Sequence, residues 1–495
     1  MLNIAYGISV PSTDVDPNLQ GTVMPQGDFG DGDIVHAASN EAAAMRPLGM
    51  DDIEAVPHAD SEINESRIVG IVNQLLLDAL RRGATDIHIE NERRQVAVRY
   101  KLDGLLYKMK TPLHKDNVDE VINRLKVMAT LDISERRSPQ DGRVLLRTLR
   151  GGRDYDVPFR ISILPGPYGE EIVLRVLDKS MAPISLELLG FTSHDLKLYR
   201  RLIQNPQGMI LVTGPTGSGK TTTLYATLKE INSPYNKILS AEDPIEYNIE
   251  GVNQKQISEK FDFADMARAF LRHDPDILLI GEIRDEDTAD VACKAAQTGH
   301  LILSTVHTND SVSTISRLNV LGLNHELIGS SLLGVLSQRL VRRICPKCTE
   351  AYEPDAEALE TFGEFAPTGP FQHGAGCDYC SRTGYRGRIG IFELLIVDDE
   401  IQRMISEHAP LDAILEISLA KGMTPLVYDG LRKVEMGYTT LEELNRVVPY
   451  RQIAMQLKRK AKYLTDEPKK EATEIVEGGI GAVADIILPP GDATN

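Results

Sequence analysis

The stretch that most constrains this chain is a glycine-rich loop, Gly214-Pro215-Thr216-Gly217-Ser218-Gly219-Lys220-Thr221. It satisfies every position of the phosphate-binding pattern G-x-x-x-x-G-K-[ST]. The apolar run 209–213 before it predicts a buried strand, and residues 222–230, which contain no Gly or Pro, predict a helix. A glycine loop at a helix N-terminus turns backbone N–H groups and a partial positive charge toward phosphate oxygens. The sequence therefore predicts a nucleotide-binding α/β domain.

The individual positions of the loop have separate expected roles. Lys220 can reach the β- and γ-phosphates, and Thr221 can place its hydroxyl on Mg²⁺. We assign nucleotide binding to the backbone and side chains of Gly214, Pro215, Thr216, Gly217, Ser218, Gly219, Lys220, Thr221 and Thr222.

Three further apolar runs, 238–241, 277–280 and 301–305, alternate with helical segments. This alternation predicts a largely parallel sheet, in which ligands bind at the carboxyl ends of the strands. Glu246, Glu282 and His307 all follow such strands, so we expect them to converge near the loop.

Hydrolysis of a nucleotide requires a positioned water, a metal and compensation of charge in the transition state. Glu246 is the candidate for polarising the water, and Glu242 is expected to support it. Glu282 stands where a Walker B carboxylate would act, through Mg²⁺ or a water. His307 could sense the γ-phosphate, whereas His300, at the other end of the same strand, is as readily a structural residue. For the acidic residues the alternative is a helix cap or a surface charge.

A separate α+β domain is predicted before the loop and ends near Ser180, with a linker at 184–190. Its elements are helices at 64–80 and 118–128 and strands at 86–90, 95–100, 142–149, 160–164 and 171–177. It carries five notable cations, each of which either belongs to a solvated surface or faces the phosphates of a nucleotide held by the other domain: Arg124, Arg137, Arg143, Arg160 and Arg175.

Four of the five cysteines form two C-x-x-C pairs, which we call the cysteine cluster: Cys345, Cys348, Cys377 and Cys380. Such pairs, in a chain that shows no signal peptide, favour a structural Zn²⁺ site over disulfides. The alternative is four reduced core cysteines, which is the reading we give Cys293.

The 495-residue chain has a net charge of −18, much of it near the N-terminus. Up to Ser66, Arg46 is the one basic residue against twelve acidic ones, so we expect residues 1–60 to be a disordered acidic tether. The remainder is close to balanced, and no nucleic-acid partner is expected. Residues 398–464 are predicted to be helical and residues 465–495 disordered. No run approaches the roughly 18 apolar residues of a membrane span.

At these motifs the chain resembles the secretion ATPase superfamily, which includes type II secretion, type IV pilus assembly and pilus retraction ATPases. The matching segments are the Walker A loop 214–221, the Asp box 242–246, the Walker B segment 281–285 and the His box 298–308. Segments 85–90, 139–142 and 338–343 match as well, so the resemblance covers about 64–464.

The resemblance implies a PAS-like α+β domain at 61–183 and a RecA-like ATPase domain at 184–397, with a zinc element at 341–395. It implies a homohexamer that binds ATP between the two domains, with Arg160 and Arg175, then Arg143, contacting phosphate. The expected function is a cytoplasmic ATPase that drives pilin or pseudopilin assembly at the inner face of the membrane, attached through an inner-membrane platform protein. The alternatives are a retraction motor, a conjugation-type translocation ATPase and a scaffold that binds nucleotide without hydrolysis.

The sequence departs from the family pattern in two places. The acidic tether replaces the N-terminal domain by which many assembly members dock to a membrane partner, so the mode of docking is open. Pro158 also lies next to the strand that carries Arg160.

Overall fold

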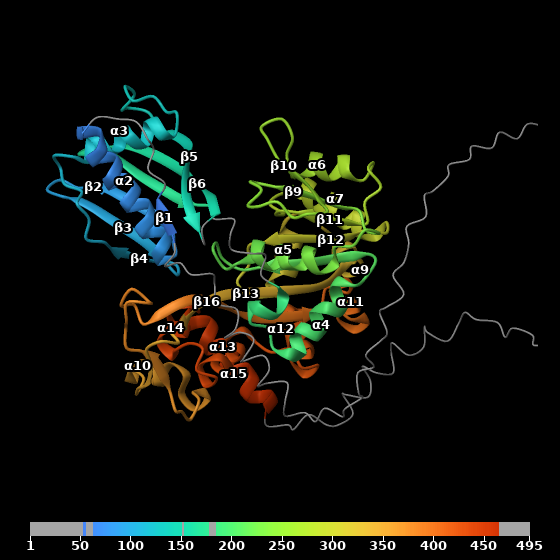
Figure 1. Ribbon diagram of the computed structural model, residues 1–495. Helices are drawn as coiled ribbons and strands as arrows, with labels where there is room; N and C mark the ends of the chain where they lie inside the picture. The colour runs from blue at the N-terminus through green and yellow to red at the C-terminus, as the bar shows by residue number, and fades with distance from the viewer. Residues whose placement is uncertain (1–52, 56–62, 151–152, 178–184, 465–495) are drawn as a thin grey trace, which may run out of the picture. The chain divides into compact units, whose positions relative to one another are not determined.

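The computed structural model describes residues 53–55, 63–150, 153–177 and 185–464 (Figure 1). The predicted tail, 465–495, and nearly all of the predicted tether, 1–60, therefore lie outside the described residues. Within the tether the structure describes a short strand, β1 (Ile53–Ala55), which pairs antiparallel with β5. The prediction of disorder does not hold for these three residues, because the edge of β5 offers their backbone hydrogen-bond partners.

The first part of the chain forms a seven-stranded antiparallel sheet with strand order β1-β5-β6-β7-β2-β3-β4. Its apolar side chains alternate along the strands and pack on one face against two amphipathic helices. Gly83, with φ of 72°, ends the first helix. The elements are α2 (Ile63–Arg82), β2 (Ala84–Asn91), β3 (Val96–Leu102), β4 (Leu105–Lys108), α3 (Val118–Met128), β5 (Gln140–Arg150), β6 (Arg153–Gly166) and β7 (Gly169–Val176).

Strand β6 is much longer than the five residues predicted at 160–164. Its first part continues the apolar alternation of the strand, with Tyr155, Val157 and Phe159 facing the same core as Ile161, but Pro158 within it argues against a strand interior. Pairing fixes the longer strand, because β6 runs antiparallel to β5 over that strand's whole length. Pro158 is accommodated within β6, opposite Leu145, and its carbonyl accepts the N–H of Leu177.

The second part of the chain is a three-layer α/β structure around a sheet of order β10-β9-β11-β12-β8-β13-β16. Neighbouring strands from β10 to β13 run parallel, and β16 pairs antiparallel with β13. The strands are β8 (Gly208–Thr213), β9 (Ile238–Glu242), β10 (Val252–Gln256), β11 (Ile277–Ile280), β12 (Leu301–Val306), β13 (Leu332–Ile344) and β16 (Tyr385–Ile396). The α/β prediction is confirmed.

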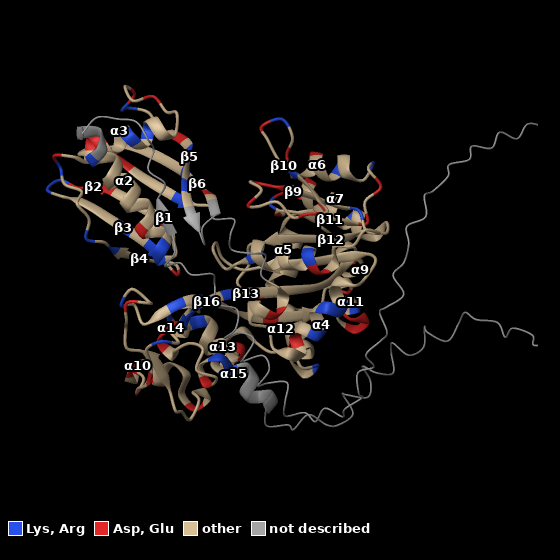
Figure 2. Ribbon diagram, viewed as in Figure 1, with Lys and Arg blue, Asp and Glu red and all other residues tan. Residues whose placement is uncertain are grey.

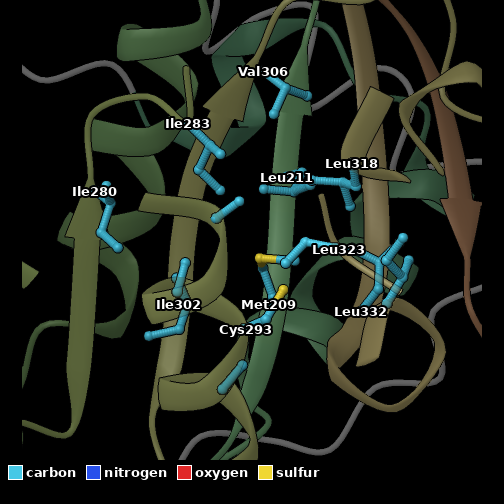
Figure 3. Close-up of a cluster of buried hydrophobic side chains, with 14 of the residues drawn as sticks. Met209, Leu211, Ile280, Ile283, Cys293, Ile302, Val306, Leu318, Leu323 and Leu332 are labelled. Carbon is cyan, nitrogen blue, oxygen red and sulfur yellow. The ribbon is translucent and has the colours of Figure 1, made fainter. Parts of the chain in front are cut away.

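The core of this α/β part lies on both faces of the sheet. On one face Met209 and Leu211 join side chains from helices α6 to α9, and Figure 3 shows this cluster. On the other face Ile210 and Val212 pack against α4 and α5. All six residues of β8 are buried, which is why its sequence is a continuous apolar run. The helices are α4 (Ser193–Ile203), α5 (Lys220–Ile231), α6 (Phe263–Phe270), α7 (Glu286–Gln297), α8 (Ser313–Val320) and α9 (His325–Ser331).

The predicted linker at 184–190 contains a 3₁₀ turn, η2 (Leu186–Leu189). Leu186 and Leu189 are buried in the core beside α4 and α5, so this part of the linker prediction is wrong. The leucines at 186, 188 and 189 form too short an apolar run to indicate a helix by periodicity, and the packing shows which of them are buried.

The C-terminal part is helical, as predicted, and follows a small loop region that contains the cysteine cluster. That region holds β14 (Thr349–Ala351), α10 (Ala356–Phe362), η3 (Gly363–Phe365) and β15 (Gln372–Gly374). The later helices are α11 (Asp399–Ser406), α12 (Leu411–Ala420), α13 (Leu426–Glu435), α14 (Leu441–Val447) and α15 (Tyr450–Leu464). Acidic and basic residues are interspersed over the described elements (Figure 2).

Candidate functional site

The phosphate loop connects the end of β8 to the start of α5, as the sequence predicts. Gly214, Gly217 and Gly219 have φ values of 145°, 77° and 89°. Residues other than glycine rarely adopt this backbone conformation. A Cβ atom at Gly214 would lie 2.3 Å from the carbonyl oxygen of Gln338. Glycine is therefore required here both for the backbone conformation and for the close approach of β13.

Lys220 begins α5 and folds back over the loop. Its Nζ donates to the carbonyl oxygens of Gly214, at 2.9 Å, and Pro215, at 3.2 Å. Burial lowers the pKa of this lysine, while the charge of Glu282 acts in the opposite direction. The ammonium therefore lies at the mouth of the loop, with a carboxylate near enough to affect its ionisation.

The underside of the loop is held by Gln338, a fully buried residue on β13. Its amide nitrogen donates to the carbonyl of Ser218 at 2.8 Å, and its amide oxygen accepts the Thr223 hydroxyl at 2.8 Å. The resemblance marked Gln338 as part of a matching segment without a role. The structure shows a brace between the central sheet and the loop.

A pocket of about 140 Å³ opens beside α5 at the carboxyl ends of β9, β11 and β12. Its walls include five of the predicted site residues: Thr221, Glu242, Glu246, Glu282 and His307. These side chains come from separate strands and loops, and the parallel sheet brings them together at one edge.

Glu282 follows β11 and points into this pocket, with 16% of its side chain exposed. One carboxylate oxygen pairs with Arg284, and the other lies 3.5 Å from Nε2 of His307. The neighbouring Asp285 faces away and caps α7, accepting the N–H of Thr288 at 2.8 Å. Of the two acids in this segment, Glu282 is therefore the one available for chemistry.

Glu242, at the end of β9, is almost completely buried and serves as a hydrogen-bond acceptor. It accepts the hydroxyls of Tyr225 and Ser240 and, at 3.0 Å, the side-chain amide of Gln254. Three donors satisfy this carboxylate within the protein, so its geometry suits an anchor for the Asp box.

Glu246 lies at the rim of the pocket, on the loop after β9. The residue as a whole is exposed, but its carboxyl group is partly buried. This burial raises the pKa of Glu246, and the negative charge of Glu242 also acts to raise it. A carboxylate with a raised pKa beside a phosphate loop suits the polarisation of a water molecule.

The two histidines of the His box lie at opposite ends of β12. His307 is half exposed and lines the pocket, close to Glu282. His300 precedes the strand at the far edge of the sheet, where its Nδ1 lies 3.0 Å from the carbonyl of Ala295. Its contacts there favour the structural reading.

Three of the five candidate arginines form a row across the antiparallel sheet. Arg143 on β5 is opposite Arg160 on β6, and Arg160 is opposite Arg175 on β7. All three are exposed, on the face of the sheet away from α2 and α3, and Arg175 pairs with Asp86 at 3.0 Å. Arg124 and Arg137 lie outside this row, on α3 and on the following loop.

The four residues of the cysteine cluster converge, and their sulfur atoms all lie within 4.8 Å of one another. Three of the sulfur pairs are separated by 3.8 Å: Cys345 with Cys377, Cys348 with Cys380, and Cys377 with Cys380. A tetrahedron with Zn–S bonds of about 2.3 Å has edges of about 3.8 Å, so the thiols fit this metal. Cys293 is separate from the cluster: it lies on α7 and is buried in the core, as expected.

Comparison with known proteins identifies the chain's relatives. The family model described as "Type II/IV secretion system protein" matches residues 61–446. The chain belongs to this family. It is 47% identical over 388 residues to the type II secretion system ATPase E of Vibrio cholerae, covering 78% of this chain and 76% of that protein. It is 42% identical to the type IV pilus assembly ATPase PilB of Myxococcus xanthus, covering 80% and 71%.

Among solved structures, the pilus retraction motor PilT with bound ADP matches with a TM-score of 0.50 and 27% identity. The match covers 76% of this chain and 96% of PilT. Membership of the secretion ATPase family, together with a complete phosphate loop, makes this protein an ATPase. Within the described residues, every helix is too short or too polar to cross a membrane.

One residue of this ATPase site was missed by the sequence reasoning. Tyr225 lines the pocket from α5, one helical turn beyond Thr221, and contacts the Asp box. Helical spacing places it on the same side of α5 as Thr221. That signal was available, but an aromatic residue in an apolar helix is usually a core residue, and its partner on β9 is distant in sequence.

Proposed function

We propose that this secretion ATPase powers the assembly of pilin or pseudopilin subunits in a type II secretion system or a type IV pilus. The observation that carries the proposal is the pattern of similarity. Identity reaches 47% with a type II secretion ATPase and 42% with a pilus assembly ATPase, against 27% with a retraction motor. The cysteine cluster supports it as well, because the resemblance associates this element with secretion and assembly members rather than with retraction members.

In the proposed site, the N–H groups of Gly214 to Thr222 cradle the phosphates of ATP, and Lys220 contacts the β- and γ-phosphates. Lys220 would exchange its present carbonyl partners for phosphate oxygens. The hydroxyl of Thr221 would hold Mg²⁺, which supplies charge neutralisation at the phosphates when it is bound.

Each of the three carboxylates has a separate role in the proposed hydrolysis. Glu246 accepts a proton from the attacking water, and its raised pKa suits that role. Glu282 orients the metal or a water, while Glu242 keeps the Asp box in place. His307, 3.5 Å from Glu282, is well placed to respond to the γ-phosphate.

Further contributions come from outside the α/β part. Arg160 and Arg175 would compensate phosphate charge when the two domains close around ATP in a homohexamer. Exposure supports this role, since neither guanidinium is buried by its own sheet.

The cysteine cluster would hold one structural Zn²⁺, with all four positions filled by thiolates. The ring would act in the cytoplasm at the inner face of the membrane, attached through an inner-membrane platform protein.

The test is deletion of the gene in the source organism, followed by counting of surface filaments and measurement of secreted protein. An assembly motor predicts loss of filaments or secretion, and restoration by wild type but not by Lys220→Ala. Excess filaments after deletion would identify a retraction motor. Restoration by Lys220→Ala would identify a scaffold that does not need hydrolysis.

A further inference from the structure

Tyr225 joins the phosphate-loop helix to the loop that carries the candidate water-polarising residue. Its ring is buried, and its hydroxyl donates a hydrogen bond to the carboxylate of Glu242. The same hydroxyl accepts the backbone N–H of Glu246 at 3.2 Å. A tyrosine hydroxyl has one donor and two acceptor positions, so it can satisfy both groups at once.

Glu242 gives this hydroxyl a fixed point of attachment. Its carboxylate also accepts the hydroxyl of Ser240 and, at 3.0 Å, the amide of Gln254, and it is only 4% exposed. A buried carboxylate with three donors has little freedom to move. The position of the Tyr225 hydroxyl is therefore set by the sheet and transmitted to the Glu246 backbone.

The rest of the loop is held by Gln254, whose amide nitrogen also lies 3.4 Å from the Tyr225 hydroxyl. Its amide oxygen accepts the N–H of Ile249 at 2.7 Å, and its amide nitrogen donates to the carbonyl of Tyr247 at 3.1 Å. The ring of Tyr247 packs edge-on against the ring of Tyr225, with the centroids 4.6 Å apart. Hydrogen bonds thus hold the loop at Glu246, Tyr247 and Ile249, and the one at Glu246 comes from Tyr225.

A comparison within the molecule separates this arrangement from ordinary packing. Tyr199 is also a fully buried tyrosine whose hydroxyl contacts α5, through Thr227 at 2.8 Å. That bond lies in the core between α4 and α5, whereas Tyr225 lines the pocket. Tyr199, on α4, therefore provides a matched control for the loss of a buried tyrosine hydroxyl that contacts α5.

We propose that Tyr225 is a positioning residue for hydrolysis, which sets the place of Glu246 relative to the phosphate loop through its hydroxyl. The proposal rests on the role proposed above for Glu246. Because Tyr225 and Thr221 share α5, the hydroxyl fixes the Asp box with respect to the helix that binds the phosphates. Displacement of a catalytic group by about 1 Å can cost on the order of 100-fold in rate.

The experiment compares Tyr225→Phe, which removes only the hydroxyl, with Tyr199→Phe in the full-length protein. We expect Tyr225→Phe to lower kcat about 10- to 100-fold while the Kd and KM for ATP change less than about threefold, because the phosphate contacts are intact. Tyr199→Phe should lose stability but keep its kcat. If Tyr225→Phe is not folded by circular dichroism, Glu242→Gln weakens the same hydrogen bond from the acceptor side and should lower kcat in the same selective way.

A double variant tests whether Tyr225 acts through Glu246. Tyr225→Phe combined with Glu246→Gln should be no slower than Glu246→Gln alone. Once the side chain at position 246 can no longer act as a base, displacing it causes no further loss of kcat. Additive losses would overturn the proposal, as would a kcat of Tyr225→Phe near that of wild type or equal losses in Tyr199→Phe. If Glu246→Gln itself hydrolyses at the wild-type rate, the role of Glu246 fails, and a slow Tyr225→Phe would then refute positioning through it.

Discussion

Replacing Gln338 by alanine should loosen the phosphate loop and weaken nucleotide binding. The side chain is 1% exposed and makes two hydrogen bonds of 2.8 Å, to the Ser218 carbonyl and the Thr223 hydroxyl. In the alanine variant, the Ser218 carbonyl and the Thr223 hydroxyl stay buried and each loses its hydrogen bond to the Gln338 amide. Each unsatisfied buried group costs about 1–3 kcal/mol, so the variant should lose about 2–6 kcal/mol of stability.

The assay is denaturant unfolding with and without ATP, in which the transition that ATP shifts reports on the nucleotide-binding part of the chain. Affinity for a fluorescent ATP analogue is measured in parallel. We expect Gln338→Ala to weaken this affinity, because Ser218 lies in the loop whose N–H groups bind phosphate. Thr227→Val is the control. It removes a buried hydroxyl from α5, the helix that carries Thr223, and the hydroxyl of Thr227 does not contact the phosphate loop. A loss below about 0.5 kcal/mol, with unchanged affinity, would refute the bracing argument.

The other predictions concern the chemistry. Lys220→Ala should weaken ATP binding by equilibrium titration, whereas Glu246→Gln and Glu282→Gln should retain binding and lose about 10²–10⁴ in kcat; wild-type rates in both glutamine variants would contradict the site assignment. Because the pKa of Glu246 is raised and the ionised form is the active base, kcat should fall as pH decreases through that raised value, and the acid limb should lie above the pH expected for an ordinary glutamate. Glu246→Gln should abolish this limb; a limb that persists in its residual activity would exclude Glu246 as its source. Elemental analysis should find about one Zn per chain, lost on substitution of the cysteine cluster and unchanged in Cys293→Ser, while metal-free protein with four freely titratable thiols would exclude the site.

Much of the candidate site could be predicted from local sequence. The glycines of the loop are required by backbone sterics, and the residues after β9, β11 and β12 follow apolar runs whose short length favours buried strands. Because parallel strands present their carboxyl ends at one edge, the convergence of Glu246, Glu282 and His307 followed without any knowledge of distances. The paired cysteine spacing likewise carried its own geometry.

Local sequence could not assign the roles of residues whose partners are distant along the chain. Gln338 reaches the phosphate loop from a strand more than a hundred residues away, and Tyr225 meets Glu242 across the sheet edge. The row formed by Arg143, Arg160 and Arg175 depends on strand register, which periodicity does not specify between strands.

What the sequence determined by itself is therefore the set of local conformations and the chemistry that each motif can perform. The phosphate loop turns at Gly214, Gly217 and Gly219, because glycine readily adopts a positive φ that other residues rarely adopt. Only the tertiary structure decided which donors hold Glu242, that His300 contacts the carbonyl of Ala295, and that Leu186 belongs to a core. The physical reason is that burial and hydrogen-bond satisfaction are properties of the assembled neighbourhood, and its members come from separate parts of the chain.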